Sequence, residues 1–238
     1  MEKNANATLS LSNYTKQLDE IRYHLASLNY LRAITRCKHL IDQLTEVLIN
    51  VKEERQFVLN EILSDVYKLL QNSYFNWLLH EPNQFGQNLK AKNGFLKNLK
   101  AATSLEYFSE QEKQHSQFLV CFTQLLFSNN IERDTLEEAR ISFCDLYNRF
   151  VEDNHTLNQA LVLFGLALIA AYEGDLCSTY QGLNHASNAY PKIHKLVKAI
   201  EYQLPRTMSS LDENAIFLMN PLAKFRLPEI VSSLKLRQ

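Results

Sequence analysis

The stretch Ala160–Pro191, ALVLFGLALIAAYEGDLCSTYQGLNHASNAYP, decides the fold that we predict for this chain. Residues 160–172 are uncharged and almost wholly apolar, but they are too few to cross a bilayer, so we expect a helix that is buried on all sides. The remainder carries an apolar residue at every third or fourth position, which predicts an amphipathic helix that ends at Pro191. An antiparallel helical hairpin at the centre of an all-α protein follows from this stretch.

Both ends of the first of these helices have recognisable signals. Thr156 and Gln159 have the spacing of a capping box, which predicts the start of the helix. Gly174 can adopt the left-handed backbone that closes a helix, and Asp175 can cap the helix that follows. Gly165 lies inside the first helix, where the lack of a side chain would let a neighbouring helix approach closely.

The hairpin resembles the tetratricopeptide repeat, a helix–turn–helix unit of about 34 residues. The residues that carry the resemblance lie at the packing positions of the first helix, at the turn and in the second helix: Leu163, Leu166, Ala167, Ala170, Gly174, Asp175, Leu176, Leu183, Ala186 and Pro191. Two positions depart from the repeat, because Thr179 replaces a small alanine and Leu163 replaces the usual tryptophan. Residues 160–193 form one good copy, and a degenerate second copy lies near residues 14–47.

The resemblance implies stacked antiparallel helical hairpins, in a TPR-like superhelix or a helical bundle, with a groove for a peptide or a helix of a partner protein. The groove-facing positions of the repeat fall on five residues of the first helix, Leu161, Phe164, Leu168, Ala171 and Tyr172. The alternative is that the preceding hairpin buries these same residues in the core. The sequence allows both.

Apolar residues recur at helical spacing along most of the remaining chain, which predicts about eight helices and no sheet. The expected helices include residues 14–28, 30–48, 59–77, 118–126, 136–150 and 193–204, and residues 83–86 are expected to form a loop. Further capping boxes are predicted at Ser109 with Glu112 and at Thr135 with Glu138. Five glycines and five prolines in 238 residues fit such a helical chain.

Two parts of the chain differ in character. Residues 1–205 are predicted to form one helical repeat-like domain, and residues 206–238 a C-terminal docking segment that Pro221 and Pro228 interrupt. Short apolar segments cannot bury their side chains among themselves, so we expect this segment to dock either on the helical body or on a partner.

Composition excludes several classes of function. The formal net charge of −1 gives no reason to expect a nucleic-acid partner, and we expect a cytoplasmic protein without a membrane span. The four cysteines have no CxxC spacing that would predict a zinc site. One lysine-rich stretch is either a docking surface for acidic groups or, as we favour, a solvated helix face: Lys90, Lys92, Lys97 and Lys100.

The only catalytic or metal-binding pattern is Glu112 with His115, an ExxH spacing that di-iron bundles use in two copies, and the second copy is missing. We therefore expect no enzyme activity, no metal and no cofactor. The predicted function is a non-enzymatic interaction module: an adaptor, chaperone or scaffold that binds a peptide or helix of a partner in a multi-protein assembly. A bacterial secretion-system accessory or effector is one such role. The alternative is a helical-bundle enzyme or metal-binding protein, which a closed pocket with convergent polar groups would indicate.

Overall fold

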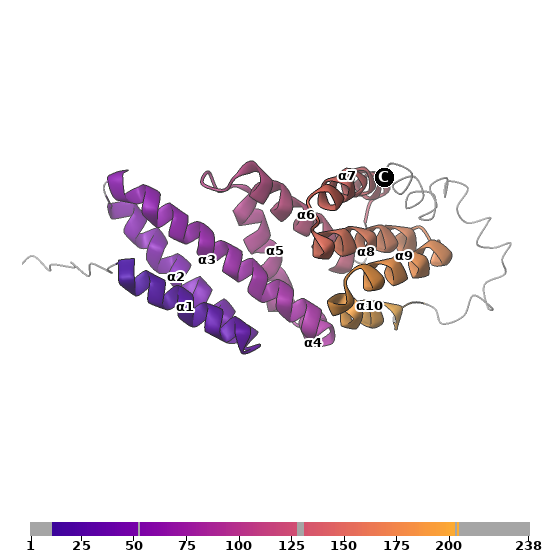
Figure 1. The fold of residues 1–238 in the computed structure, drawn as a ribbon, viewed down its shortest axis with the longest axis horizontal. Helices are drawn as coiled ribbons and strands as arrows, with labels where there is room; N and C mark the ends of the chain where they lie inside the picture. The colour runs from indigo at the N-terminus through magenta and orange to yellow at the C-terminus, as the bar shows by residue number, and fades with distance from the viewer. Residues whose placement is uncertain (1–10, 52, 128–130, 203, 205–238) are drawn as a thin grey trace, which may run out of the picture. The chain divides into compact units, whose positions relative to one another are not determined.

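The computed structural model describes residues 11–51, 53–127, 131–202 and 204. Within these ranges the chain forms ten α-helices and one 3-10 helix, and no strand (Figure 1). The predicted all-α fold is therefore confirmed. The C-terminal docking segment, residues 206–238, lies outside the described residues, so its docking stays a prediction.

The chain divides into two compact units, a division that the sequence did not reveal. Unit 1 consists of residues 1–77 and 93–114, and unit 2 of residues 78–92 and 115–238. Both boundaries of the inserted segment 78–92 fall inside helices, because α3 spans Glu53–His80 and α5 spans Leu89–Thr103. Neither boundary coincides with a flexible linker of the kind that composition can indicate.

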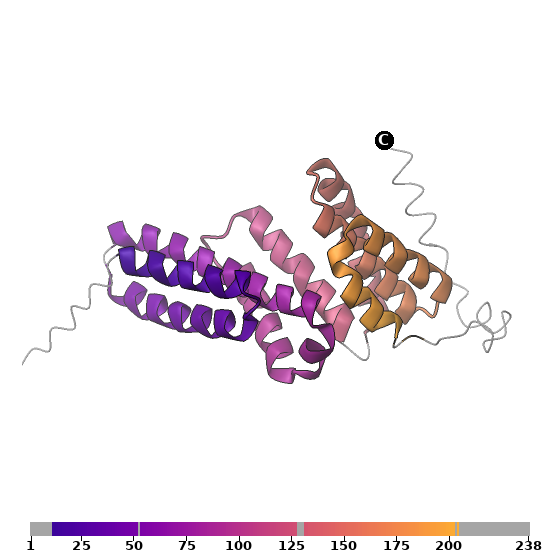
Figure 2. The same cartoon turned by 60° about the horizontal axis from the view of Figure 1, so that its bottom comes forward.

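Unit 1 is built on a hairpin of α1 (Leu11–Ala26) and α2 (Tyr30–Asn50), with α3 beside it (Figures 1 and 2). The predicted apolar spacing places one face of each helix in the core. Its buried members include Tyr14, Leu18 and Ile21 on α1, and Tyr30, Ile34, Cys37 and Leu44 on α2. Leu28, which the same spacing assigned to this face, is instead 61% exposed, because α1 has ended before it.

The start of α6 (Glu110–Phe127) belongs to unit 1 and is capped as predicted. The backbone N–H of Ser109 donates to the Glu112 carboxylate at 2.8 Å, and the backbone N–H of Glu112 donates to the Ser109 hydroxyl at 3.3 Å. The Lys68 ammonium of α3 lies 2.5 Å from the same carboxylate. The two hydrogen bonds between Ser109 and Glu112 form the capping box.

Unit 2 contains α4 (Pro82–Gln87), α7 (Arg133–Glu152), α8 (Thr156–Tyr172), α9 (Leu176–Ala189), the 3-10 helix η1 (Pro191–Ile193) and α10 (His194–Glu201). Consecutive helices pack in pairs, α7 on α8, α8 on α9 and α9 on α10, and α10 also contacts α4 (Figures 1 and 2). Every residue of α8 from Ala160 to Ala170 is buried. The prediction of a central apolar helix is confirmed.

Aromatic rings fill the core beside α8. Phe118 of α6 contacts Phe143 of α7 with ring centroids 5.2 Å apart, and Phe122 contacts Phe164 of α8 at 5.6 Å. Gly165 permits this packing, because a Cβ atom on it would lie 2.2 Å from the Phe143 ring. The predicted role of Gly165 in close helix approach is confirmed.

Within the described part of the chain, three helix ends use a left-handed residue. The positive φ angles are 57° at Leu28 after α1, 57° at Asn154 after α7 and 79° at Gly174 after α8. The predicted turn at Gly174 is thus confirmed, and so is the cap on α9, since the Asp175 carboxylate accepts from the Ser178 backbone N–H at 3.0 Å.

The capping box predicted at the start of α8 is wrong, although the helix does begin at Thr156. The Gln159 side chain does not turn back to the helix start, because its amide donates to the Phe150 backbone oxygen at 2.7 Å. Gln159 therefore satisfies a carbonyl at the end of α7, a contact that only the tertiary structure creates.

Two further predictions are wrong. Thr135 does not cap with Glu138, because α7 begins earlier, at Arg133, and Thr135 lies within its first turn. Residues 83–86 are not a loop, because they belong to α4, whose first residue is Pro82. A proline at the first helical position has a suitable φ angle and loses no hydrogen bond, so here it starts a helix as well as ending the preceding one.

Candidate functional site

The predicted groove residues lie on α8 in unit 2. Three of them are buried, with exposed fractions of 1% for Leu161, 0% for Phe164 and 5% for Leu168, while Ala171 and Tyr172 are half-buried. The Tyr172 hydroxyl donates to the Leu125 backbone oxygen at 2.9 Å, so it supports the end of α6. This burial corresponds to the core alternative for three of the five residues, and their role in partner binding stays a prediction.

The ExxH pattern is not part of a larger ligand set. In the described ranges, no three His, Cys, Asp or Glu side chains gather closely enough to hold a metal ion. Glu112 is engaged by Ser109 and Lys68, and the His115 ring lies 6.3 Å from the Phe118 ring. Glu112 therefore caps the start of α6, and His115 is a half-buried histidine beside the aromatic core.

His115 should make unit 2 sensitive to acid. Burial lowers the pKa of His115, and the nearby His155 lowers it further. The folded chain therefore disfavours the charged imidazole. The contribution of neutral His115 to the free energy of unfolding is fully present above the ordinary histidine pKa of about 6.5. It is lost as the pH falls from there through the lowered pKa of the folded chain. Melting temperatures of the wild type and His115→Gln at pH 7.5 and 5.0 should show a smaller acid-induced decrease in the variant. Equal decreases in both proteins would contradict this expectation, because the other six histidines are present in both.

Cys37, Cys121 and Cys144 show no sign of activation. Burial raises the pKa of Cys37 to about 12, and burial is also the leading cause of the raised pKa values of Cys121 and Cys144. Only the thiolate is a strong nucleophile, so these three thiols are unreactive near neutral pH.

Cys121 lies in an open cleft of about 400 Å³ in unit 2, between α6 and α7. The cleft is lined by apolar surface together with the polar side chains of Gln117, Gln124, Glu132, Thr135, Glu138 and Ser142; Leu125, Ile131 and Ala139 also line it. The nearby Glu138 carboxylate further raises the pKa of the Cys121 thiol. The cleft therefore lacks an activated nucleophile.

The lysine-rich stretch resembles a solvated face. Lys90, Lys97 and Lys100 are exposed, and the Lys92 ammonium lies 5.4 Å from the centroid of the Phe127 ring. Among the described helices, none combines the length with the apolar composition that a bilayer crossing needs.

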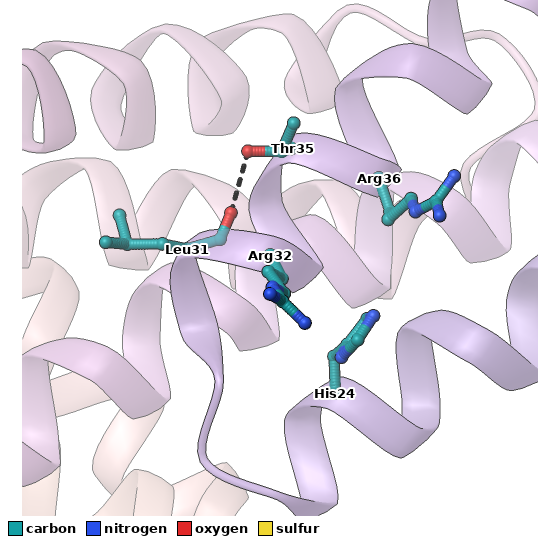
Figure 3. A pocket seen from close by; sticks show the side chains of 5 residues that line it. All are labelled: His24, Leu31, Arg32, Thr35 and Arg36. Carbon is teal, nitrogen blue, oxygen red and sulfur yellow. Dashed lines mark hydrogen bonds between the residues drawn. The ribbon is translucent and has the colours of Figure 1, made fainter.

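An open pocket of about 320 Å³ lies at the tip of the α1–α2 hairpin in unit 1. Its lining is His24 from the last turn of α1 and Leu31, Arg32, Thr35 and Arg36 from the first two turns of α2 (Figure 3). The His24 and Arg32 side chains point toward one another, and the Thr35 hydroxyl donates to the Leu31 backbone oxygen at 2.8 Å (Figure 3). Three nitrogen-bearing side chains therefore share one small pocket.

Exposed apolar side chains accompany this pocket. Tyr23 is 69% exposed and its ring lies 5.8 Å from that of His24, while Leu31 is 59% exposed. Leu28 lies in the turn between the two helices. We call these residues together with the pocket lining the hairpin-tip surface: Tyr23, His24, Leu28, Leu31, Arg32, Thr35 and Arg36.

Leu28 closes α1 in a Schellman motif. Its backbone N–H donates to the Leu25 oxygen at 3.0 Å, and the Asn29 N–H donates to the His24 oxygen at 2.8 Å. Glycine is the usual residue at this left-handed position, because a side chain there crowds the backbone. The chain thus places a bulky apolar residue where its backbone is strained and its side chain meets solvent.

Sequence reasoning missed this surface because Leu28 continues the apolar spacing of Leu18, Ile21 and Leu25. The available signal was the position of Leu28 just before Asn29, a residue type that favours turns, between the predicted helices 14–28 and 30–48. A predicted helix that ends at Ala26, where α1 does end, would leave Leu28 outside the helix and its apolar face.

The pocket in unit 1 brings guanidinium groups, an imidazole and an apolar side chain together around one opening. Its Thr35 hydroxyl donates to the Leu31 backbone oxygen. No protein-family model, curated protein or solved structure matches the chain. The resemblance to the tetratricopeptide repeat therefore rests on the residues of the chain itself, in the α8–α9 hairpin and in the degenerate copy near residues 14–47.

Proposed function

We propose that this protein is a non-enzymatic interaction module that binds a partner protein through the hairpin-tip surface. The observation that carries the proposal is Leu28, which combines a left-handed backbone with a 61% exposed apolar side chain. The Schellman motif needs the left-handed backbone but not a leucine, and a strained residue where glycine would serve is a reason to look for a function at that position.

The two other left-handed helix ends provide the comparison. Asn154 and Gly174 occupy the same position after α7 and α8, and both are residue types that tolerate it. At Leu28 the left-handed conformation costs about 1–2 kcal/mol, and an exposed side chain recovers little of this by burial. A partner that covers Leu28 would bury the side chain and offset the strain.

The open form of both pockets supports a binding module over the enzyme alternative. The pocket of the hairpin-tip surface and the cleft beside Cys121 are open to solvent. The Thr35 hydroxyl donates to the Leu31 backbone oxygen rather than to His24, and the pKa of the Cys121 thiol is raised. Enzymes usually enclose their substrates in a deep site with convergent polar groups.

The test is Leu28→Gly, a change that should stabilise the chain and impair its function. Glycine relieves the strain at φ 57°, so we expect the free energy of unfolding to rise by up to about 1 kcal/mol after the entropy of glycine is counted. Capture of partners from the source cells, quantified by mass spectrometry, should lose at least one protein that the wild type retains. The matched control is Ile141→Ala, which removes an exposed apolar side chain from α7 of unit 2.

The proposal requires that Leu28→Gly reduces partner binding without reducing stability. A more stable Leu28→Gly variant that loses a partner retained by Ile141→Ala supports it, because global unfolding cannot explain the loss. Identical sets of captured proteins for the wild type and both variants would show that Leu28 has no role in binding.

A further inference from the structure

We infer that the hairpin-tip surface recognises an acidic segment of a partner protein, in which an Asp or Glu carboxylate lies beside apolar side chains. Arg32 and Arg36 receive the carboxylate, and Leu28 and Leu31 contact the apolar side chains. This inference rests on the proposed function, because it names the chemistry of the partner that the same surface binds.

Basic residues outnumber acidic ones at the hairpin tip, with Asp19, Glu20 and Asp42 just outside the basic stretch. The 21 residues 21–41 contain four lysines and arginines, Arg22, Arg32, Arg36 and Lys38, and no aspartate or glutamate. Two of these four side chains line the pocket itself. For the whole chain, the 25 basic residues are balanced by 26 acidic ones, so the excess of positive charge is local.

The two pocket arginines are available to a ligand. Arg32 has no carboxylate within ion-pair distance among the described residues, and the Arg36 guanidinium is 3.8 Å from the Glu20 carboxylate. Both members of the Arg36 pair are about half exposed, at 56% and 43% of their side chains, so water weakens their attraction. A carboxylate that enters the pocket would not displace a strong internal pair.

The charged groups of the pocket are donors. Guanidinium groups donate and cannot accept, whereas the Thr35 hydroxyl, which gives its proton to the Leu31 oxygen, can only accept from a ligand. The His24 and Arg32 side chains face one another across the pocket (Figure 3), so an acceptor between them can bind both. A ligand with two acceptor oxygens fits this arrangement, because a carboxylate accepts from a guanidinium through both of them.

The apolar neighbours select a protein segment over a nucleic acid. Nucleic-acid sites extend as basic stripes that follow successive phosphates, whereas here two arginines share a pocket of about 320 Å³ with exposed Leu31. The near-neutral net charge of −1 also gives no long-range attraction to a polyanion. One carboxylate flanked by apolar side chains matches both the charge and the apolar surface.

The experiment is selection of peptides by the full chain. A phage-displayed library of random 16-residue peptides is the probe, and the selected peptides are resynthesised and their affinities measured by fluorescence anisotropy. We expect enrichment of Asp or Glu beside Leu or Phe, loss of binding to Leu28→Gly, and about tenfold weaker binding to Arg32→Gln/Arg36→Gln. The control is Lys97→Gln/Lys100→Gln, which removes two exposed positive charges from α5 and should leave the affinity unchanged.

The outcomes separate this inference from the proposed function. Peptides that depend on Leu28 but lack acidic enrichment, or that bind the double arginine variant as well as the wild type, overturn the acidic partner and leave the binding surface intact. If no selected peptide depends on Leu28, the proposed function fails and the inference fails with it. Equal weakening by the arginine and lysine variants would show non-specific charge attraction and would also overturn the inference.

Discussion

Replacing Phe164 with alanine is expected to lower the free energy of unfolding by about 3–5 kcal/mol. The Phe164 side chain is fully buried, and its ring lies 5.6 Å from that of Phe122. Alanine would leave a cavity at the centre of unit 2, where α7 and α9 both pack against α8. Chemical denaturation monitored by circular dichroism measures the change.

The matched control is Phe57→Ala, the same substitution at an exposed site of α3, which should alter stability by less than about 0.5 kcal/mol. The result also decides the role of the groove predicted from the repeat resemblance. If Phe164→Ala abolished partner binding without a loss of stability, Phe164 would be a groove residue and its burial in α8 would not reflect the free protein.

Replacing Gly165 with valine should destabilise unit 2 by about 3 kcal/mol or more, and replacement with alanine by about 1–3 kcal/mol. Even the single Cβ of alanine would lie 2.2 Å from one carbon of the Phe143 ring and 2.8 Å from another. Phe143 is itself fully buried against Phe118, so its ring cannot move without disturbing the aromatic core. The melting temperatures of the wild type and the two variants show whether valine destabilises the protein more than alanine does.

Gly86→Ala provides the control, because nothing lies within 4 Å of a Cβ at that position of α4. It should leave stability unchanged or raise it slightly, since alanine favours helix over glycine by up to about 1 kcal/mol. A second variant, Gly165→Ala with Phe143→Leu, should recover part of the loss if the clash is its cause. A Gly165→Ala variant as stable as the wild type would refute the close packing of α7 on α8.

Local signals predicted the helical hairpin of α8 and α9 well. The uncharged run from Ala160 can be buried on every side, and Gly174 and Asp175 act on backbone groups within a few residues of themselves. The capping box of Ser109 with Glu112 was predictable for the same reason. In each case the residues that interact are neighbours in sequence.

Predictions failed at the ends of helices. Gln159 had the correct spacing for a capping box, but its amide donates to the Phe150 oxygen at the end of the preceding helix. Leu28 had the correct spacing for the core, but α1 ends at Ala26 and leaves it exposed. The spacing of apolar residues predicts which side of a helix a residue lies on, but it does not predict the residue at which the helix ends.

The sequence by itself determined the all-α class, the central hairpin and the residues that turn and cap it, because helix periodicity, glycine turns and caps are local properties of the chain. Only the tertiary structure decided the division into two units, the identity of Phe143 as the neighbour of Gly165, and the pocket that His24, Arg32 and Arg36 line at the hairpin tip. The physical reason is that burial and exposure depend on which helices become neighbours in space. That choice minimises the exposed apolar surface of many helices together, and no single helix contains the information.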